Sequence, residues 1–141
     1  MKFRLTVFLL TLPCLMAHAA IGAVTADDRF LAARDAVRAG DRAKLERIAS
    51  ELQGHELQAY VEYWQLLLDL NYTDPSTIRA FLSRYEKSYV AEKLRSDWLK
   101  QLGRKQQWAQ FDAEFPLLGQ PDQELSCFAL QSRQARGDAS M

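Results

Sequence analysis

The scarcity of β-branched residues constrains the fold of this chain more than any other feature of its sequence. From residue 20 to residue 141 there are three Ile, four Val and three Thr, against sixteen Leu and seventeen Ala. Ala and Leu favour helices, whereas β-branched side chains are enriched in strands. No stretch shows the alternation of apolar and polar residues that a half-buried strand requires. Composition and pattern together predict an all-α fold.

Helix boundaries follow from capping residues, prolines and glycines. Gly40 is predicted to end one helix and Asp41 to cap the next, while Asp74 with Pro75 starts another. Gly103 is predicted to end the helix before it, and Pro116 to end the following one. The signals predict seven helices, at about 28–39, 41–53, 56–70, 75–85, 90–102, 108–115 and 121–136.

The residues predicted to lie in turns recur at a regular spacing. Gly40, Asn71, Gly103 and Gly137 are separated by 31, 32 and 34 residues, which is the period of a helix-pair repeat. Each hairpin of such a repeat buries only part of its apolar surface, so neighbouring hairpins stack to complete a core. The predicted architecture is therefore an α-superhelix, a solenoid of stacked antiparallel hairpins over residues 20–141. Because a turn that should open another helix directly precedes the last residue, we expect a truncated superhelix.

The first nineteen residues have the pattern of a secretory signal peptide. Lys2 and Arg4 precede an apolar run over residues 5–16, and Ala17-His18-Ala19 follows as a cleavage site. The apolar run is too short to span a bilayer, which needs about 20 residues, so no membrane anchor is predicted. Residues 20–141 are expected to form a soluble, exported domain.

Charge and cysteine content exclude two further classes of protein. Lys+Arg and Asp+Glu number 18 each, so the chain lacks the basic excess of a nucleic-acid-binding protein. Once the signal peptide is removed, Cys127 is the one remaining thiol, and no internal disulfide can form. Its neighbours Leu125, Phe128 and Ala129 indicate a small buried hydrophobic residue in a helix, and a reactive or intermolecular thiol is the alternative.

The sequence contains no recognisable catalytic or metal-binding motif. It has no glycine-rich phosphate loop, no HExxH zinc motif, no paired cysteines and no nucleophile elbow. His55, the one histidine after the signal peptide, is interpreted as a turn or capping residue. We therefore predict no catalytic, cofactor-binding or metal-ligating residue, and no cofactor.

Three groups of side chains have both a functional and a structural interpretation, and the structural one is favoured for each. The functional interpretation of the glutamates is a carboxylate facing a glycan, but they are expected to be solvated on helix surfaces: Glu46, Glu51, Glu56, Glu62, Glu86, Glu92 and Glu114. The functional interpretation of the aromatic residues is stacking on sugars, but they are expected to pack in the core: Trp64, Trp98, Trp108, Tyr60, Tyr63 and Tyr72. The functional interpretation of a basic stripe is contact with an acidic partner, but it is expected to be a solvated face: Lys93, Lys100, Arg104 and Lys105, interrupted by Asp97.

Five short motifs follow one another along the chain. They are His55-Glu56-Leu57 with Tyr60-Val61-Glu62-Tyr63 and Leu66, Ile78-Arg79-Ala80-Phe81-Leu82, Leu94-Arg95-Ser96-Asp97-Trp98-Leu99, Trp108, and Glu124-Leu125-Ser126-Cys127. Their order and spacing, over almost all of residues 20–141, resemble the N-terminal superhelical U-shaped region of soluble lytic murein transglycosylases. The sequence departs from that pattern at Glu56 and Ala59, where the family usually has prolines.

The resemblance implies a periplasmic role at the cell wall. Enzymes of this family cleave the β-1,4 bond between N-acetylmuramic acid and N-acetylglucosamine of peptidoglycan and form a 1,6-anhydro product. The glutamate that acts as acid and then base belongs to a C-terminal domain that this chain does not contain, so the chain alone is expected to be inactive. Its implied role is that of a scaffold segment.

Two other functions stay open at the level of sequence. The first is a stand-alone periplasmic helical-repeat adaptor that binds a protein partner in its concave groove. The second is a stand-alone murein-binding module.

Overall fold

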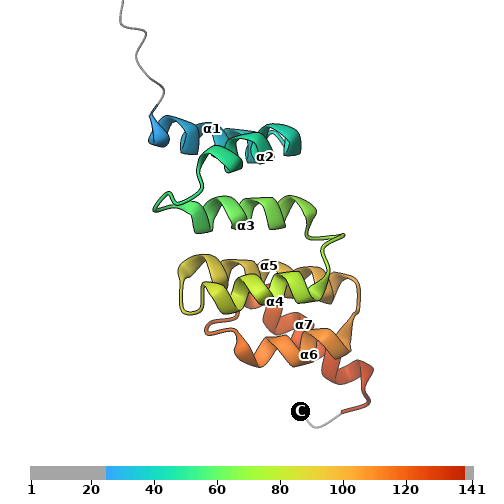
Figure 1. Cartoon of the computed structure of the whole chain (residues 1–141). Coiled ribbons are helices and arrows are strands. Elements are labelled where there is room, and N and C mark those ends of the chain that lie inside the picture. The colour runs from blue at the N-terminus through green and yellow to red at the C-terminus, as the bar shows by residue number, and fades with distance from the viewer. Residues whose placement is uncertain (1–24, 139–141) are drawn as a thin grey trace, which may run out of the picture.

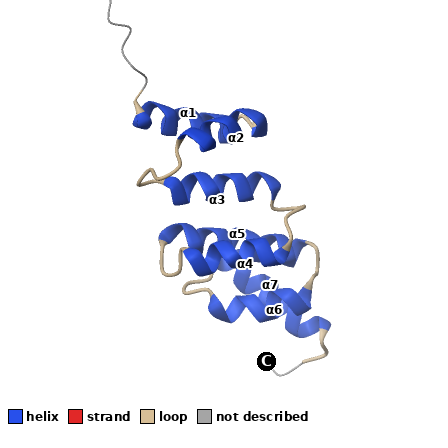
Figure 2. Cartoon of the chain, in the orientation of Figure 1, coloured by secondary structure: helices blue, strands red, loops and turns tan. Residues whose placement is uncertain are grey.

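The computed structural model describes residues 25–138, and every regular element in that range is helical. The elements are α1 (Ala26–Arg38), α2 (Arg42–Glu51), α3 (Gln58–Asp69), α4 (Pro75–Arg84), α5 (Tyr89–Arg104), α6 (Trp108–Glu114), the 3₁₀ helix η1 (Phe115–Leu117) and α7 (Gln123–Ala135). Figures 1 and 2 show their arrangement. The predicted all-α class is confirmed. The predicted signal peptide, residues 1–19, lies outside the described residues.

Five of the helices described begin at a side-chain N-cap. At the start of α1, the Thr25 hydroxyl accepts the Asp28 N–H at 3.1 Å, and the Asp28 carboxylate accepts the Thr25 N–H at 3.0 Å. The Thr25 N–H and, to a lesser extent, the Thr25 hydroxyl donate to the Asp28 carboxylate and lower its pKa. The predicted starts at Asp41 and Asp74 are confirmed, and each carboxylate accepts a backbone N–H of the first turn.

Three of the helices end in the same kind of turn. Gly40 and Gly137 have φ angles of 68° and 74°, and the residue after each donates its N–H to a carbonyl five positions earlier. Gln106, with a φ of 55°, makes the same turn after α5. The turns predicted at Gly40 and Gly137 are confirmed, and the prediction that Gly103 ends its helix is wrong.

Gly103 lies inside α5, at a point where Phe128 of α7 packs closely against the helix. A Cβ atom added to Gly103 would lie only 2.5 Å from the ring of Phe128 in α7. Glycine is therefore required here for close packing of two helices. The turn predicted at Gly103 occurs three residues later, at Gln106.

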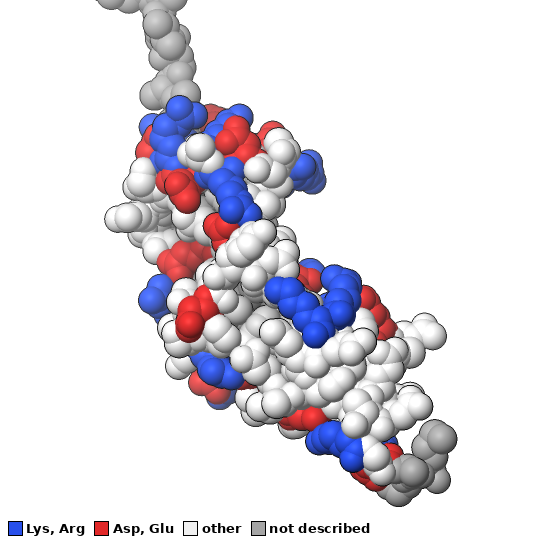
Figure 3. Space-filling view, turned by 90° about the vertical axis from the view of Figure 1, so that its right-hand side faces the viewer, with Lys and Arg blue, Asp and Glu red and all other residues white. Residues whose placement is uncertain are grey.

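The odd-numbered and even-numbered helices form two layers. In the first layer α1 packs on α3, α3 on α5, and α5 on α7. The even-numbered helices form the second layer, and each packs on helices of the first: α2 on α1 and α3, α4 on α5, and α6 on α5 and α7. Within the described residues, α2 and α4 do not form a closely packed pair, and neither do α4 and α6. The molecule is elongated in the direction in which the helices follow one another (Figures 1 and 3).

The hydrophobic core consists of two clusters that share Trp64. The smaller cluster comes from α1, α2 and α3, and its buried residues are Ala33, Ala36, Leu45, Ile48, Leu52 and Val61. The larger cluster extends from α3 to α7, with Leu94, Leu99 and Phe111 fully buried. Trp98 is buried in it and Trp108 packs against it, as predicted. No helix between residues 25 and 138 combines the length and the hydropathy that a bilayer crossing demands.

Cys127 is exposed on α7, so its predicted burial is wrong. The face of α7 that packs inward contains Leu125, Phe128 and Ser132, which are spaced three and four residues apart. Cys127 lies two residues after Leu125, and residues two positions apart point to nearly opposite sides of a helix. Cys127 therefore faces away from the core.

Candidate functional site

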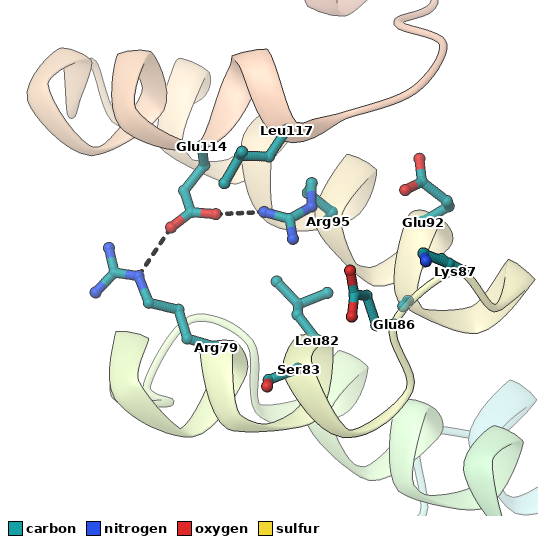
Figure 4. Close-up of a pocket in the computed structure, with 10 residues that line it drawn as sticks. Arg79, Leu82, Ser83, Glu86, Lys87, Glu92, Arg95, Glu114 and Leu117 are labelled. Atoms are coloured by element: carbon teal, nitrogen blue, oxygen red, sulfur yellow. Dashed lines mark hydrogen bonds and ion pairs between the residues drawn. The ribbon is translucent and has the colours of Figure 1, made fainter.

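A groove of about 500 Å³ lies between α4 and α6, and α5 forms its floor (Figure 4). It exists because these two even-numbered helices do not pack closely on each other. Its volume falls in the range of small-ligand sites, about 300–1,000 Å³. Its lining residues are Arg79, Leu82, Ser83, Glu86, Lys87, Ala91, Glu92, Arg95, Glu114 and Leu117.

Glu114 is the buried charged residue of this groove. Its side chain is 6% exposed, and its Oε1 atom accepts the Nε–H of Arg79 at 2.8 Å. Its other oxygen accepts a hydrogen bond from Nη1 of Arg95. The expectation of a solvated Glu114 is wrong, because Phe111 lies three residues earlier on the same face of α6 and turns that face toward the core. This spacing is the sequence signal that would have identified it.

The two arginines make the burial of Glu114 tolerable. A buried carboxylate is costly unless it is paired and hydrogen-bonded, and here both of its oxygens have a guanidinium partner. Arg79 also lies over the ring of Trp98, 5.5 Å from the ring centroid, which fixes its position on α4. Glu114 therefore ties α6 to α4 and α5, and both of its oxygens are engaged in that role.

The expectation of a solvated Glu62 is also wrong, because its side chain is only 22% exposed and forms a similar tie between α3 and α4. Its carboxylate accepts hydrogen bonds from Arg84 at 3.0 Å, from the Tyr85 hydroxyl at 2.9 Å and from Gln58 at 2.8 Å. Partial burial of Tyr85 and its hydrogen bond to Glu62 raise the pKa of the tyrosine. The other glutamates named from the sequence are exposed as predicted: Glu46, Glu51, Glu56, Glu86 and Glu92.

The predicted basic stripe on α5 contacts acidic residues of the same chain. Lys100 pairs with Asp122, and Arg104 pairs with Glu124 at 2.8 Å. The hydrogen bond from Lys100 lowers the pKa of Asp122, and that from Arg104 lowers the pKa of Glu124. The expected solvated face is therefore in large part an interface between α5 and the start of α7. Basic and acidic side chains also lie beside one another along the face seen in Figure 3.

The side chains of Lys93 and Tyr63 share Asp97 as a hydrogen-bond partner. The Tyr63 hydroxyl donates to one oxygen of Asp97 and the Lys93 ammonium to the other, each at 2.7 Å. Burial of Tyr63, together with this hydrogen bond, raises the pKa of the tyrosine. Asp97 therefore compensates a positive charge and joins α3 to α5.

Five of the six aromatic residues named from the sequence pack in or against the core, as expected: Trp64, Trp98, Trp108, Tyr60 and Tyr63. The expectation is wrong for Tyr72, which is 86% exposed. Tyr72 lies in the turn between α3 and α4, outside the helical face whose period predicted burial.

His55 lies in the turn before α3, and its interpretation as a turn residue is confirmed. Its Nδ1 atom accepts the N–H of Leu57 at 3.1 Å, and its ring stacks on Phe30 with 6.1 Å between ring centroids. Within residues 25–138, no three or more His, Cys, Asp and Glu side chains are grouped so that they could hold a metal ion.

Comparison with known proteins identifies no relative of this chain. The chain has no significant match among protein-family models, among characterised proteins or among solved structures. The resemblance to the U-shaped region of lytic transglycosylases stays a prediction from the sequence motifs.

Proposed function

We propose that this chain is a helical-repeat scaffold, an α-superhelix of stacked hairpins like the U-shaped region of soluble lytic murein transglycosylases. The recurrence of left-handed turn residues carries the proposal. Lys87 follows Gly54 by 33 residues, and Gly137 follows Gln106 by 31. Gln106 follows Gly40 by 66 residues, which is two such periods. A period of this length is that of a helix-pair repeat.

The contacts between helices support the same proposal. Each helix packs on helices that are near it in chain order, and the described part of α1 makes no close contact with α5, α6 or α7. Repeat proteins have this quasi-one-dimensional organisation, and they use their long surfaces to position other molecules.

The placement of charged side chains also supports a scaffold. Glu114, Glu62 and Asp97 are each held by partners on a neighbouring helix. Such ties hold adjacent helices in a fixed relative position, and this is the property a scaffold needs.

In this proposal the chain is exported to the periplasm and positions a glycan-cleaving domain on peptidoglycan strands. Cleavage between N-acetylmuramic acid and N-acetylglucosamine, with a 1,6-anhydro product, belongs to that domain. The sequence motifs support this assignment through their resemblance to the family.

The test is to isolate the native antigen from the periplasm of the host with antibody raised against residues 25–138. The proposal predicts a protein several-fold larger than this chain that releases 1,6-anhydro products from purified peptidoglycan, as measured by mass spectrometry. An antigen of about the size of this chain would favour the adaptor. A large antigen without that activity would contradict the transglycosylase assignment.

A further inference from the structure

The groove between α4 and α6 has an excess of positive charge at one end. Arg79 and Arg95 lie there with Glu114, so two guanidinium groups face one carboxylate. The Arg79 side chain is 50% exposed, and its Nε atom is the one bound to Glu114. A guanidinium has five N–H donors, so the Nη groups of Arg79 keep donors for a further anion.

The other end of the groove has an excess of negative charge. Glu86 and Glu92 lie there with Lys87, and all three are exposed. Among the described residues, neither Glu86 nor Lys87 has an ion-pair partner, and Glu92 accepts the N–H of Gly119 with one oxygen at 3.0 Å. Carboxylate oxygens therefore face the groove with capacity for a cation.

An apolar surface separates the two charged ends. Leu82 and Ala91 form part of the wall between the ends, and Leu117, 60% exposed, lies beside Glu114 at the basic end. Figure 4 shows Arg79 and Glu114 on one side of Leu82, Glu86, Glu92 and Lys87 on the other, and Arg95 above Leu82, between the two groups. The charge of the groove therefore changes from basic at Arg79 to acidic at Glu86 and Glu92.

We infer that this groove binds a short zwitterionic peptide. Its carboxylate accepts hydrogen bonds from Arg79, its ammonium group lies between Glu86 and Glu92, and its short apolar side chains contact Leu82 and Leu117. A carboxylate matches the planar donors of arginine, and an ammonium group is bound by carboxylates. The inference is independent of the proposed scaffold role, because the groove belongs to the described chain itself.

The test is a titration of the full chain with three tripeptide probes, in which changes in the NMR chemical shifts of the protein measure binding. Trialanine has both charges, N-acetyl-trialanine lacks the ammonium group, and trialanine amide lacks the carboxylate. We expect trialanine to bind and each blocked form to bind at least about tenfold more weakly. Absence of binding by trialanine, or equal binding of the three probes, would overturn the inference.

Substitutions at the acidic end assign that end to the ammonium group. In Glu86→Gln with Glu92→Gln, trialanine should bind about tenfold more weakly, and binding of N-acetyl-trialanine should stay unchanged. The matched control is Glu46→Gln with Glu56→Gln, two exposed glutamates outside this groove, and it should bind trialanine like the parent chain. An equal loss of trialanine affinity in the two double variants would show that the peptide binds outside this groove, and would overturn the inference. Melting temperatures of all variants show whether the fold is retained.

Discussion

Glu114 joins α6 to α4 and α5 through Arg79 and Arg95. Glu114→Ala removes the carboxylate and leaves Arg95, whose side chain is 16% exposed, without its partner. We expect a loss of about 3 kcal/mol in the free energy of unfolding, as for other broken buried pairs. Urea denaturation measures it. The exposed control Glu56→Ala should change stability by less than about 0.5 kcal/mol, and equal effects of the two substitutions would contradict the account.

Single residues show where the sequence is informative about burial and where it is not. Helical periodicity predicts the packing of Trp64 and Trp98 correctly, because both share a face with other apolar residues. It fails for Cys127, whose apolar sequence neighbours lie on other sides of the helix. For Glu114 the spacing from Phe111 does indicate a buried position, but the partners that make its burial possible, Arg79 and Arg95, are distant in the sequence.

The end of α5 depends on a non-glycine residue in the left-handed conformation. Gln106 has a φ of 55°, a conformation that costs a residue with a Cβ roughly 1 kcal/mol. Gln106→Gly should therefore raise the free energy of unfolding by about 1 kcal/mol, and thermal or urea denaturation measures the change. The matched variant Gly137→Gln should be destabilised, because it introduces the same strain at a φ of 74°. A stability loss in Gln106→Gly would contradict this explanation of the turn.

The crossing of α5 and α7 depends on the absence of a side chain at Gly103. Alanine is normally better than glycine within a helix, by about 1 kcal/mol. At Gly103 the new methyl group would overlap the ring of Phe128, so Gly103→Ala should be destabilised by about 1–3 kcal/mol.

A second substitution separates packing from helix propensity at Gly103. In a Phe128→Ala background the overlap is removed, and Gly103→Ala should then be neutral or stabilising. Urea denaturation of the parent chain, the two single variants and the double variant measures the coupling between the two positions. Additive effects of the two substitutions would show that Phe128 is not the reason for the glycine.

The contact between α5 and the start of α7 should be sensitive to acid. The pKa values of Asp122 and Glu124 are lowered by hydrogen bonds from Lys100 and Arg104. A carboxylate with a lowered pKa in the folded state adds stability above its unfolded pKa, about 4, and loses it as pH falls through the folded value. The melting temperature should therefore fall below about pH 4. The double variant Asp122→Asn, Glu124→Gln should show a shallower fall, and an unchanged slope would contradict the assignment.

At the scale of helices, the sequence is most informative about where they begin. The N-caps at Asp41, Asp74 and Asp122 act through hydrogen bonds to residues two or three positions later, so the signal is local. The sequence signal for the end of α5 is not local in this sense. Gly103 is a residue type typical of a helix end, and only the position of Phe128 on α7 explains why a glycine is needed inside α5.

At the scale of the molecule, each helix packs on helices that are near it in chain order. The groove between α4 and α6 follows from this arrangement, because the even-numbered helices pack on odd-numbered ones and leave space between themselves. Neither the groove nor its two charged ends is visible in the sequence, since the lining residues come from separate helices. Of the four turn residues whose spacing predicts a solenoid, Gly40 and Gly137 adopt the left-handed conformation, and Asn71 and Gly103 do not. The solenoid therefore stays a proposal.

Native-state hydrogen exchange tests the proposed solenoid most directly, because helices that contact only their neighbours should unfold locally. Leu45→Ala creates a cavity in the smaller cluster, formed by α1, α2 and α3, and Leu99→Ala creates one in the larger cluster. We predict that Leu45→Ala accelerates amide exchange in α1 and α2 and leaves α5 to α7 unchanged, while Leu99→Ala has its main effect on α4 to α7. Equal acceleration along the whole chain in Leu45→Ala would contradict the account.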